Sequence, residues 1–143
     1  MADMVHAVIG DLGVALHTDK TPSREEWDAF MSSIRVVPSA RVRILAITDG
    51  GGPSTVHRGQ FVKYLDGAKA RIAVVSEALV VRGIVTALSW FTNNIRVFAP
   101  DDFRAAIAHV DLTQDECDAV KARLREMATR LPGPVRAMRG IDA

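Results

Sequence analysis

The strongest candidate for a binding function is the stretch 49–55, which reads DGGGPST and follows the apolar run 42–47. A turn of this kind before a helix offers free backbone amides and the positive end of the helix dipole, which favour an anion or a partner carboxylate. The stretch lacks both the P-loop signature and the Gly-x-Gly-x-x-Gly signature. Two interpretations stay open. It is either a tight turn in which Asp49 caps amides and glycines adopt positive φ, or a surface that binds a regulatory partner.

Other residue types that support catalysis or metal binding are scattered along the chain. The four histidines, His6, His17, His57 and His109, include no pair with the spacing of a helical metal site, and Cys117 has no cysteine partner. No Gly-x-Ser-x-Gly elbow is present to hold a nucleophilic serine. We therefore expect no enzymatic activity, no metal and no cofactor.

The composition is that of an ordinary folded domain. The 143 residues are 48% hydrophobic and 24% charged, with a net charge of +1. This length suits one domain with a sizeable core, and the balanced charge gives no sign of a nucleic-acid partner. A single cysteine favours a reducing compartment. Because no signal-peptide pattern and no apolar run of about 20 residues is visible, we expect a cytoplasmic protein without membrane insertion.

An alternation of strands and helices surrounds the glycine-rich stretch. Two short apolar runs around Gly10 predict an N-terminal β-hairpin. Further strands are predicted at residues 42–47, 72–75 and 95–98. Helices are predicted to begin near residues 23, 54, 77, 100 and 113, the first and last at capping boxes, SREE and TQDE. This order predicts an α/β fold with a four- to five-stranded, mostly parallel sheet flanked by helices, plus an extra C-terminal helix.

The predicted helix from Glu77 to Trp90 is apolar at nearly every position. Such a helix is normally buried on more than one side. We expect one side to cover the sheet and the other to be covered by the C-terminal helix or by a partner protein. Arg82 then either reaches solvent or a carboxylate such as Glu77, or joins Trp90 and Phe91 in a binding surface.

Three parts are expected along the chain. Residues 1–111 form the α/β domain, and residues 112–131 form an amphipathic helix that packs on this domain or on a partner. Residues 132–143, which contain the sequence Pro-Gly-Pro, are expected to be a flexible tail.

Two segments carry a family resemblance: ILAITDGGGP at 44–53, and 73–91, which runs from AVVS to LSWF. Over residues 4–110 the chain resembles the STAS domain (sulfate transporter and anti-sigma-factor antagonist), in particular its SpoIIAA-like branch, which grades into SEC14-like lipid-binding proteins. The resemblance implies a bacterial signalling domain that binds proteins and is not an enzyme. In that family a serine or threonine directly after an aspartate acts as the switch. Asp49 matches the aspartate, but Gly50 and Gly51 replace the phosphoacceptor, and Ser54 and Thr55 are the nearest hydroxyls.

We therefore predict a surface that binds a protein partner, such as a regulatory kinase or another signalling or effector protein. Its predicted residues are Asp49, Gly50, Gly51, Gly52, Ser54, Thr55, Arg58, Arg82 and Trp90. Two other hypotheses stay open. The apolar third helix could wall a pocket for a lipid or nucleotide, or the chain could assemble into a homo-oligomer.

Overall fold

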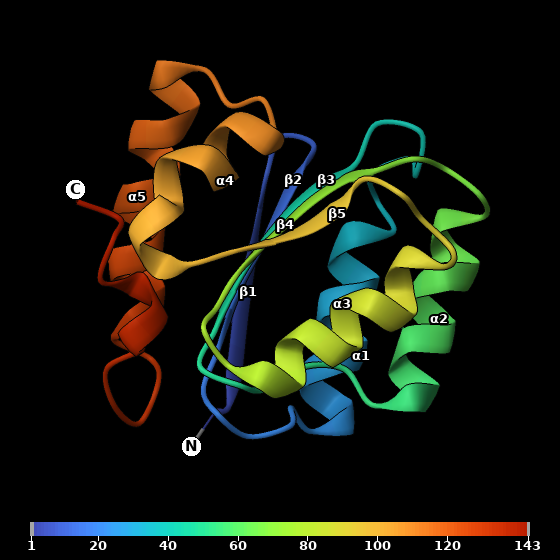
Figure 1. The fold of residues 1–143 in the computed structure, drawn as a ribbon, viewed down its shortest axis with the longest axis horizontal. Helices are drawn as coiled ribbons and strands as arrows, with labels where there is room; N and C mark the ends of the chain where they lie inside the picture. Colours follow the sequence, from blue (N-terminus) through green and yellow to red (C-terminus); the bar gives the residue numbers. More distant parts are fainter. Residues whose placement is uncertain (1, 143) are drawn as a thin grey trace.

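A five-stranded mixed sheet separates two layers of helices in the computed structural model, which describes residues 2–142 (Figure 1). The strands follow chain order across the sheet: β1 (Met4–Ile9), β2 (Leu12–His17), β3 (Arg43–Thr48), β4 (Arg71–Val75) and β5 (Ile95–Phe98). β1 is antiparallel to β2, and each later strand is parallel to the one before it. The predicted α/β class is confirmed, as is the hairpin at one edge of the sheet.

One layer contains the three helices that connect the parallel strands. These are α1 (Arg24–Ile34), α2 (Thr55–Leu65) and α3 (Leu79–Ser89), and Figure 1 shows them on the same side of the sheet. The other layer contains α4 (Phe103–His109) and α5 (Gln114–Ala128). A short 3₁₀ turn precedes α4 (Pro100–Asp102), and another follows α5 (Arg136–Met138). The predicted capping boxes at Ser23 and Thr113 are both confirmed.

Strand residues alternate between the two helix layers, because successive side chains point to opposite faces of a sheet. In β3, Leu45 and Ile47 belong to the core beneath α4 and α5, which we call the α4–α5 face. Ile44 and the partly buried Ala46 belong to the core beneath α1, α2 and α3, the α1–α3 face. This alternation decides which residues can share a site.

The C-terminal stretch packs on the α4–α5 face. Val135, Ala137 and Ile141 are buried in the same core as Val120 and Leu124 of α5. Residues 132–142, for which the sequence predicts a flexible tail, are therefore part of the packed structure. Their apolar side chains find a groove between α5 and the sheet that the local sequence does not reveal.

The two sides of α3 have different surroundings. Val81, Val85 and Leu88 are buried against the sheet, as expected for the inner side. The outer side is uncovered within the described chain, because α5 lies on the opposite face of the sheet (Figure 1). Of the two covers expected for this side, the C-terminal helix is excluded, and cover by a partner protein stays a prediction.

Candidate functional site

Two amides of the glycine-rich turn, those of Gly50 and Gly51, are used within the protein. The Gly50 N–H donates to Oγ1 of Thr48 (3.0 Å), and the Gly51 N–H donates to the Thr18 carbonyl (2.9 Å). A Cβ atom at Gly51 would lie 2.1 Å from the carbonyl oxygen of Lys20. Glycine is therefore required at this position by close packing of two loops, which supports the interpretation as a tight turn rather than an anion site.

Asp49 points away from α2, on the same face as Leu45 and Ile47. Its two carboxylate oxygens accept hydrogen bonds from the backbone N–H groups of Arg136 (2.8 Å) and Ala137 (2.9 Å). The predicted regulatory aspartate thus fastens the C-terminal stretch to the end of β3. It does cap amides, as one interpretation of the sequence holds, but these amides come from the far end of the chain.

The first turn of α2 brings three predicted residues together. Ser54 is the N-cap and accepts a hydrogen bond from the His57 N–H. The Arg58 guanidinium donates to the Thr55 hydroxyl (3.0 Å) and to the Pro53 carbonyl (3.1 Å). Arg58 therefore lies beside the exposed Thr55 hydroxyl and stabilises the turn that leads into the helix.

The outer surface of α3 is apolar and exposed. We define this surface by Leu79, Val80, Arg82, Trp90 and Phe91. Its four apolar side chains are 80%, 61%, 77% and 61% exposed, respectively. Arg82 forms no ion pair within residues 2–142, and the suggested partner Glu77 instead binds Arg139 through both oxygens (2.8 and 3.0 Å). Two of the predicted site residues, Arg82 and Trp90, thus lie on this surface. Asp49, which the sequence predicts to belong to the same site, lies elsewhere, at the end of β3.

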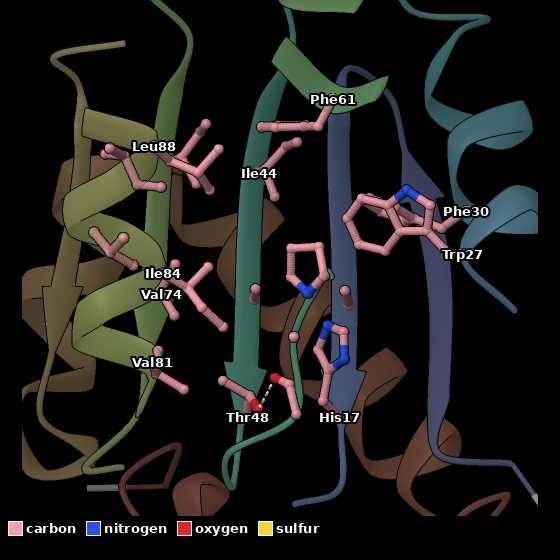
Figure 2. A pocket seen from close by; sticks show the side chains of 18 residues that line it. His17, Trp27, Phe30, Ile44, Thr48, Phe61, Val74, Val81, Ile84 and Leu88 are labelled. Atoms are coloured by element: carbon pink, nitrogen blue, oxygen red, sulfur yellow. Dashed lines mark hydrogen bonds between the residues drawn. The ribbon is translucent and has the colours of Figure 1, made fainter. Parts of the chain in front are cut away.

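A cavity of about 80 Å³ lies between the α1–α3 face of the sheet and its helices (Figure 2). Trp27 and Phe30 form one side, and Val81, Ile84 and Leu88 form the other. The remaining wall comes from the strands, from Phe61 of α2 and from the turn at Gly51, Gly52 and Pro53. The glycine-rich turn and the inner side of α3 therefore line the same cavity.

Two small residues explain why the cavity exists. Ala15 of β2 and Ala46 of β3 are neighbours in the sheet and both line the cavity floor. An alanine fills less of the space under the helices than the valines and isoleucines around it, so the layers do not close completely. Ala46 is only partly buried although it lies in the middle strand. The cavity is partly open to solvent.

His17 is the most unusual group in the cavity wall. Its residue is 4% exposed, and its ring nitrogen Nδ1 is buried without a hydrogen-bond partner in the described chain. Burial lowers the pKa of His17 to about 4, despite an opposing influence of Glu26, so the ring is neutral at pH 7. Figure 2 shows the imidazole projecting from the end of β2 among the lining side chains, near Thr48. A buried polar atom without a partner is uncommon and calls for an explanation.

A second hollow, of about 520 Å³, lies at the carboxyl ends of β2, β3 and β4. It is polar and is bordered by the C-terminal stretch. Two of its carboxylates, Asp49 and Glu77, already bind that stretch, and the hydrogen bonds from Arg139 lower the pKa of Glu77. This hollow thus belongs to the fastening of the C-terminus.

Sequence reasoning missed His17 and the alanine pair. From the sequence, His17 is assigned no metal site and Trp27 is not singled out. One signal was available: His17 ends a strand whose other members are mostly apolar, two positions after Ala15, so alternation places both on one face. Its lack of a partner depends on packing between distant segments.

No family model matches the chain, and comparisons with curated proteins and with solved structures give no match either. In the described residues, no group of three or more His, Cys, Asp or Glu side chains is arranged to hold a metal ion. No helix in residues 2–142 has the length and apolar character needed to cross a membrane.

Proposed function

We propose that this protein is a non-catalytic interaction domain with a STAS-like fold, which docks a partner protein through the outer surface of α3. The observation that carries the proposal is the exposure of Leu79 and Val80 at the start of α3 and of Trp90 and Phe91 directly after its end. Large exposed apolar side chains along one surface are typical of protein interaction sites, and tryptophan is common among the residues that dominate binding. The resemblance of residues 44–53 and 73–91 to the STAS family supports the same conclusion.

The shape and charge of this surface indicate the chemistry of the partner. Leu79 and Trp90 are eleven residues apart on the helix, which corresponds to roughly 16 Å. Gly83 and Thr86 lie between them, are exposed and are small, so a partner helix can approach closely. Arg82 is exposed and forms no ion pair within the described residues, so a partner that buries it must supply a carboxylate. We infer a partner helix with large apolar side chains and one acidic residue.

A second copy of the chain fits this surface less well. Two α3 helices would bring two Arg82 side chains to the interface, and the nearby acid Glu77 is already bound to Arg139. A buried charge without a counter-charge is unfavourable. A different protein with a carboxylate is therefore the better occupant.

Co-purification from the native host, followed by reconstitution with the purified partner, tests the proposal. The test variant is Leu79→Asp combined with Trp90→Asp. The matched control is Val36→Asp, because Val36 is 83% exposed but lies after α1. We expect the double variant to bind the partner at least about tenfold more weakly, and the control to bind as wild type does.

Equal affinity of the double variant, or capture of no stoichiometric partner, would contradict docking through α3. Light scattering over a range of concentrations provides the second measurement. A dimer that the double variant abolishes would instead assign the surface to a second copy of the chain.

A further inference from the structure

We propose that the cavity beneath α1, α2 and α3 binds a small neutral molecule that has an apolar part and one hydroxyl group, with the hydroxyl held by His17. This site is separate from the outer surface of α3 and does not depend on the proposed docking function. It is formed by the inner side of α3, by α1 and by the floor of the sheet.

The cavity fits an apolar molecule better than water. A single water needs roughly 10–15 Å³ of such space, so about 80 Å³ is room for several. Ordered water also needs two to four polar partners, whereas the wall here is almost entirely apolar. An apolar group gains from leaving solvent and from contacts with Trp27, Phe61 and Ile84.

The unpartnered Nδ1 atom of His17 specifies the polar group of the ligand, which reaches this almost inaccessible atom when the side chains around it shift. A neutral imidazole has one nitrogen that donates and one that accepts, and which is which depends on the tautomer. A hydroxyl can both donate and accept, so it satisfies Nδ1 in either tautomer. No other polar group on the described chain does so.

A charged ligand is unfavourable in this cavity. No lysine, arginine, aspartate or glutamate lines it, and the pKa of His17 keeps the ring uncharged at neutral pH. An ion would therefore lose its hydration without gaining a counter-charge. The ligand class is thus a neutral alcohol rather than a fatty acid, an amine or a phosphate ester.

The volume limits the size of the buried part. An apolar cavity of about 150 Å³ holds benzene, so about 80 Å³ accommodates an alkyl group of about four carbon atoms. Because the cavity is partly open to solvent, a small molecule can enter it. A butyl alcohol is therefore a suitable probe.

NMR titration of the uniformly ¹⁵N-labelled protein tests the site with 1-butanol and with 1-chlorobutane. The two probes have similar size, but the chloride cannot donate a hydrogen bond. We expect both probes to shift the signals of cavity-lining residues, and 1-butanol to bind about tenfold more tightly. The Nδ1 resonance of His17 should move with 1-butanol alone.

Two variants separate the apolar and polar parts of the proposal. Ala46→Leu fills the cavity floor and should abolish binding of both probes while the spectrum stays that of a folded protein. His17→Leu has nearly the same side-chain volume as wild type and should still bind 1-chlorobutane. It should lose the preference for 1-butanol, so that the two affinities become equal.

Several results would overturn the site. Shifts confined to the outer surface of α3, or no shifts up to the solubility limit of either probe, would exclude the cavity. Binding that persists in Ala46→Leu would place the ligand elsewhere. A preference for 1-butanol that survives in His17→Leu would remove His17 from the site even if the cavity binds.

Discussion

The two faces of the sheet differ in how completely their apolar side chains are packed and their polar groups are hydrogen-bonded. On the α4–α5 face, Leu16, Leu45 and Leu124 are fully buried. Polar groups at its margin are paired as well, since the Arg43 guanidinium binds Asp11 and Glu116 at 2.6 and 2.7 Å. This face behaves as a closed core.

The α1–α3 face is packed less completely and leaves polar atoms without partners. It has an open cavity, and buried polar atoms of His17, Trp27, His57 and Gln60 lack partners within the described chain. α3, which covers part of this face, exposes its own apolar outer surface. Both faces have extensive buried cores, and the difference is that one closes over its side chains whereas the other keeps a cavity and unpartnered polar atoms.

The largest expected effect compares one leucine from each face. Leu124→Ala should lower the free energy of unfolding by about 3–4 kcal/mol, because Leu124 is fully buried in a closed core. Leu88→Ala, next to the existing cavity, should lower it by about 2 kcal/mol, because Leu88 already lacks neighbours on one side. Urea denaturation measures both. Equal losses would remove the distinction between the faces.

A smaller effect concerns pH and the α1–α3 face. Because burial lowers the pKa of His17 to about 4 from an ordinary 6.5, the unfolded chain binds a proton more readily than the folded protein does. The stability that the neutral ring retains at pH 7 is therefore lost as the pH falls from about 6.5 toward 4. Between pH 7 and pH 5 we expect a loss of about 2 kcal/mol from this group.

His17→Leu isolates that contribution, because carboxylates elsewhere titrate equally in both proteins. The variant should lose about 2 kcal/mol less than wild type over the same pH interval. Urea denaturation at the two pH values measures the difference. Parallel pH dependence of the two proteins would mean that His17 is already charged or accessible in the folded state.

The smallest effect concerns the C-terminal fastening on the α4–α5 face. Asp49→Asn replaces one accepting oxygen with an NH₂ group that faces a backbone N–H, and should cost about 1–2 kcal/mol. Hydrogen exchange should rise across residues 132–142. The matched control, Asp101→Asn, removes an exposed ion pair with Arg139 and should change stability by less than about 0.5 kcal/mol. Unchanged exchange in Asp49→Asn would contradict the fastening.

Features that depend on neighbouring residues could be predicted from the sequence. Both capping boxes join residues three apart, Ser23 with Glu26 and Thr113 with Glu116, and both are present. The strand and helix order likewise follows from local hydrophobic periodicity. For α3, the same periodicity indicated the amount of apolar surface but not what covers it.

Features that depend on distant residues were not predictable. The partners of Asp49 lie 87 and 88 positions later in the chain, so its role as an anchor could not be inferred from the turn. The cavity depends on Ala15 meeting Ala46 across two strands, which requires the register of the sheet. The predicted partner-binding role of Asp49, Gly50 and Gly51 stays a prediction, although their polar groups are occupied internally.

The long sequence separation between Asp49 and its partners affects how the protein is made. Synthesis proceeds from the N-terminus, so the strands and α1, α2 and α3 emerge before residues 132–142 do. Val135, Ala137 and Ile141 complete the core beneath α4 and α5. This core therefore reaches its full set of side chains only after Ile141 has emerged, whereas every residue of the α1–α3 layer emerges earlier.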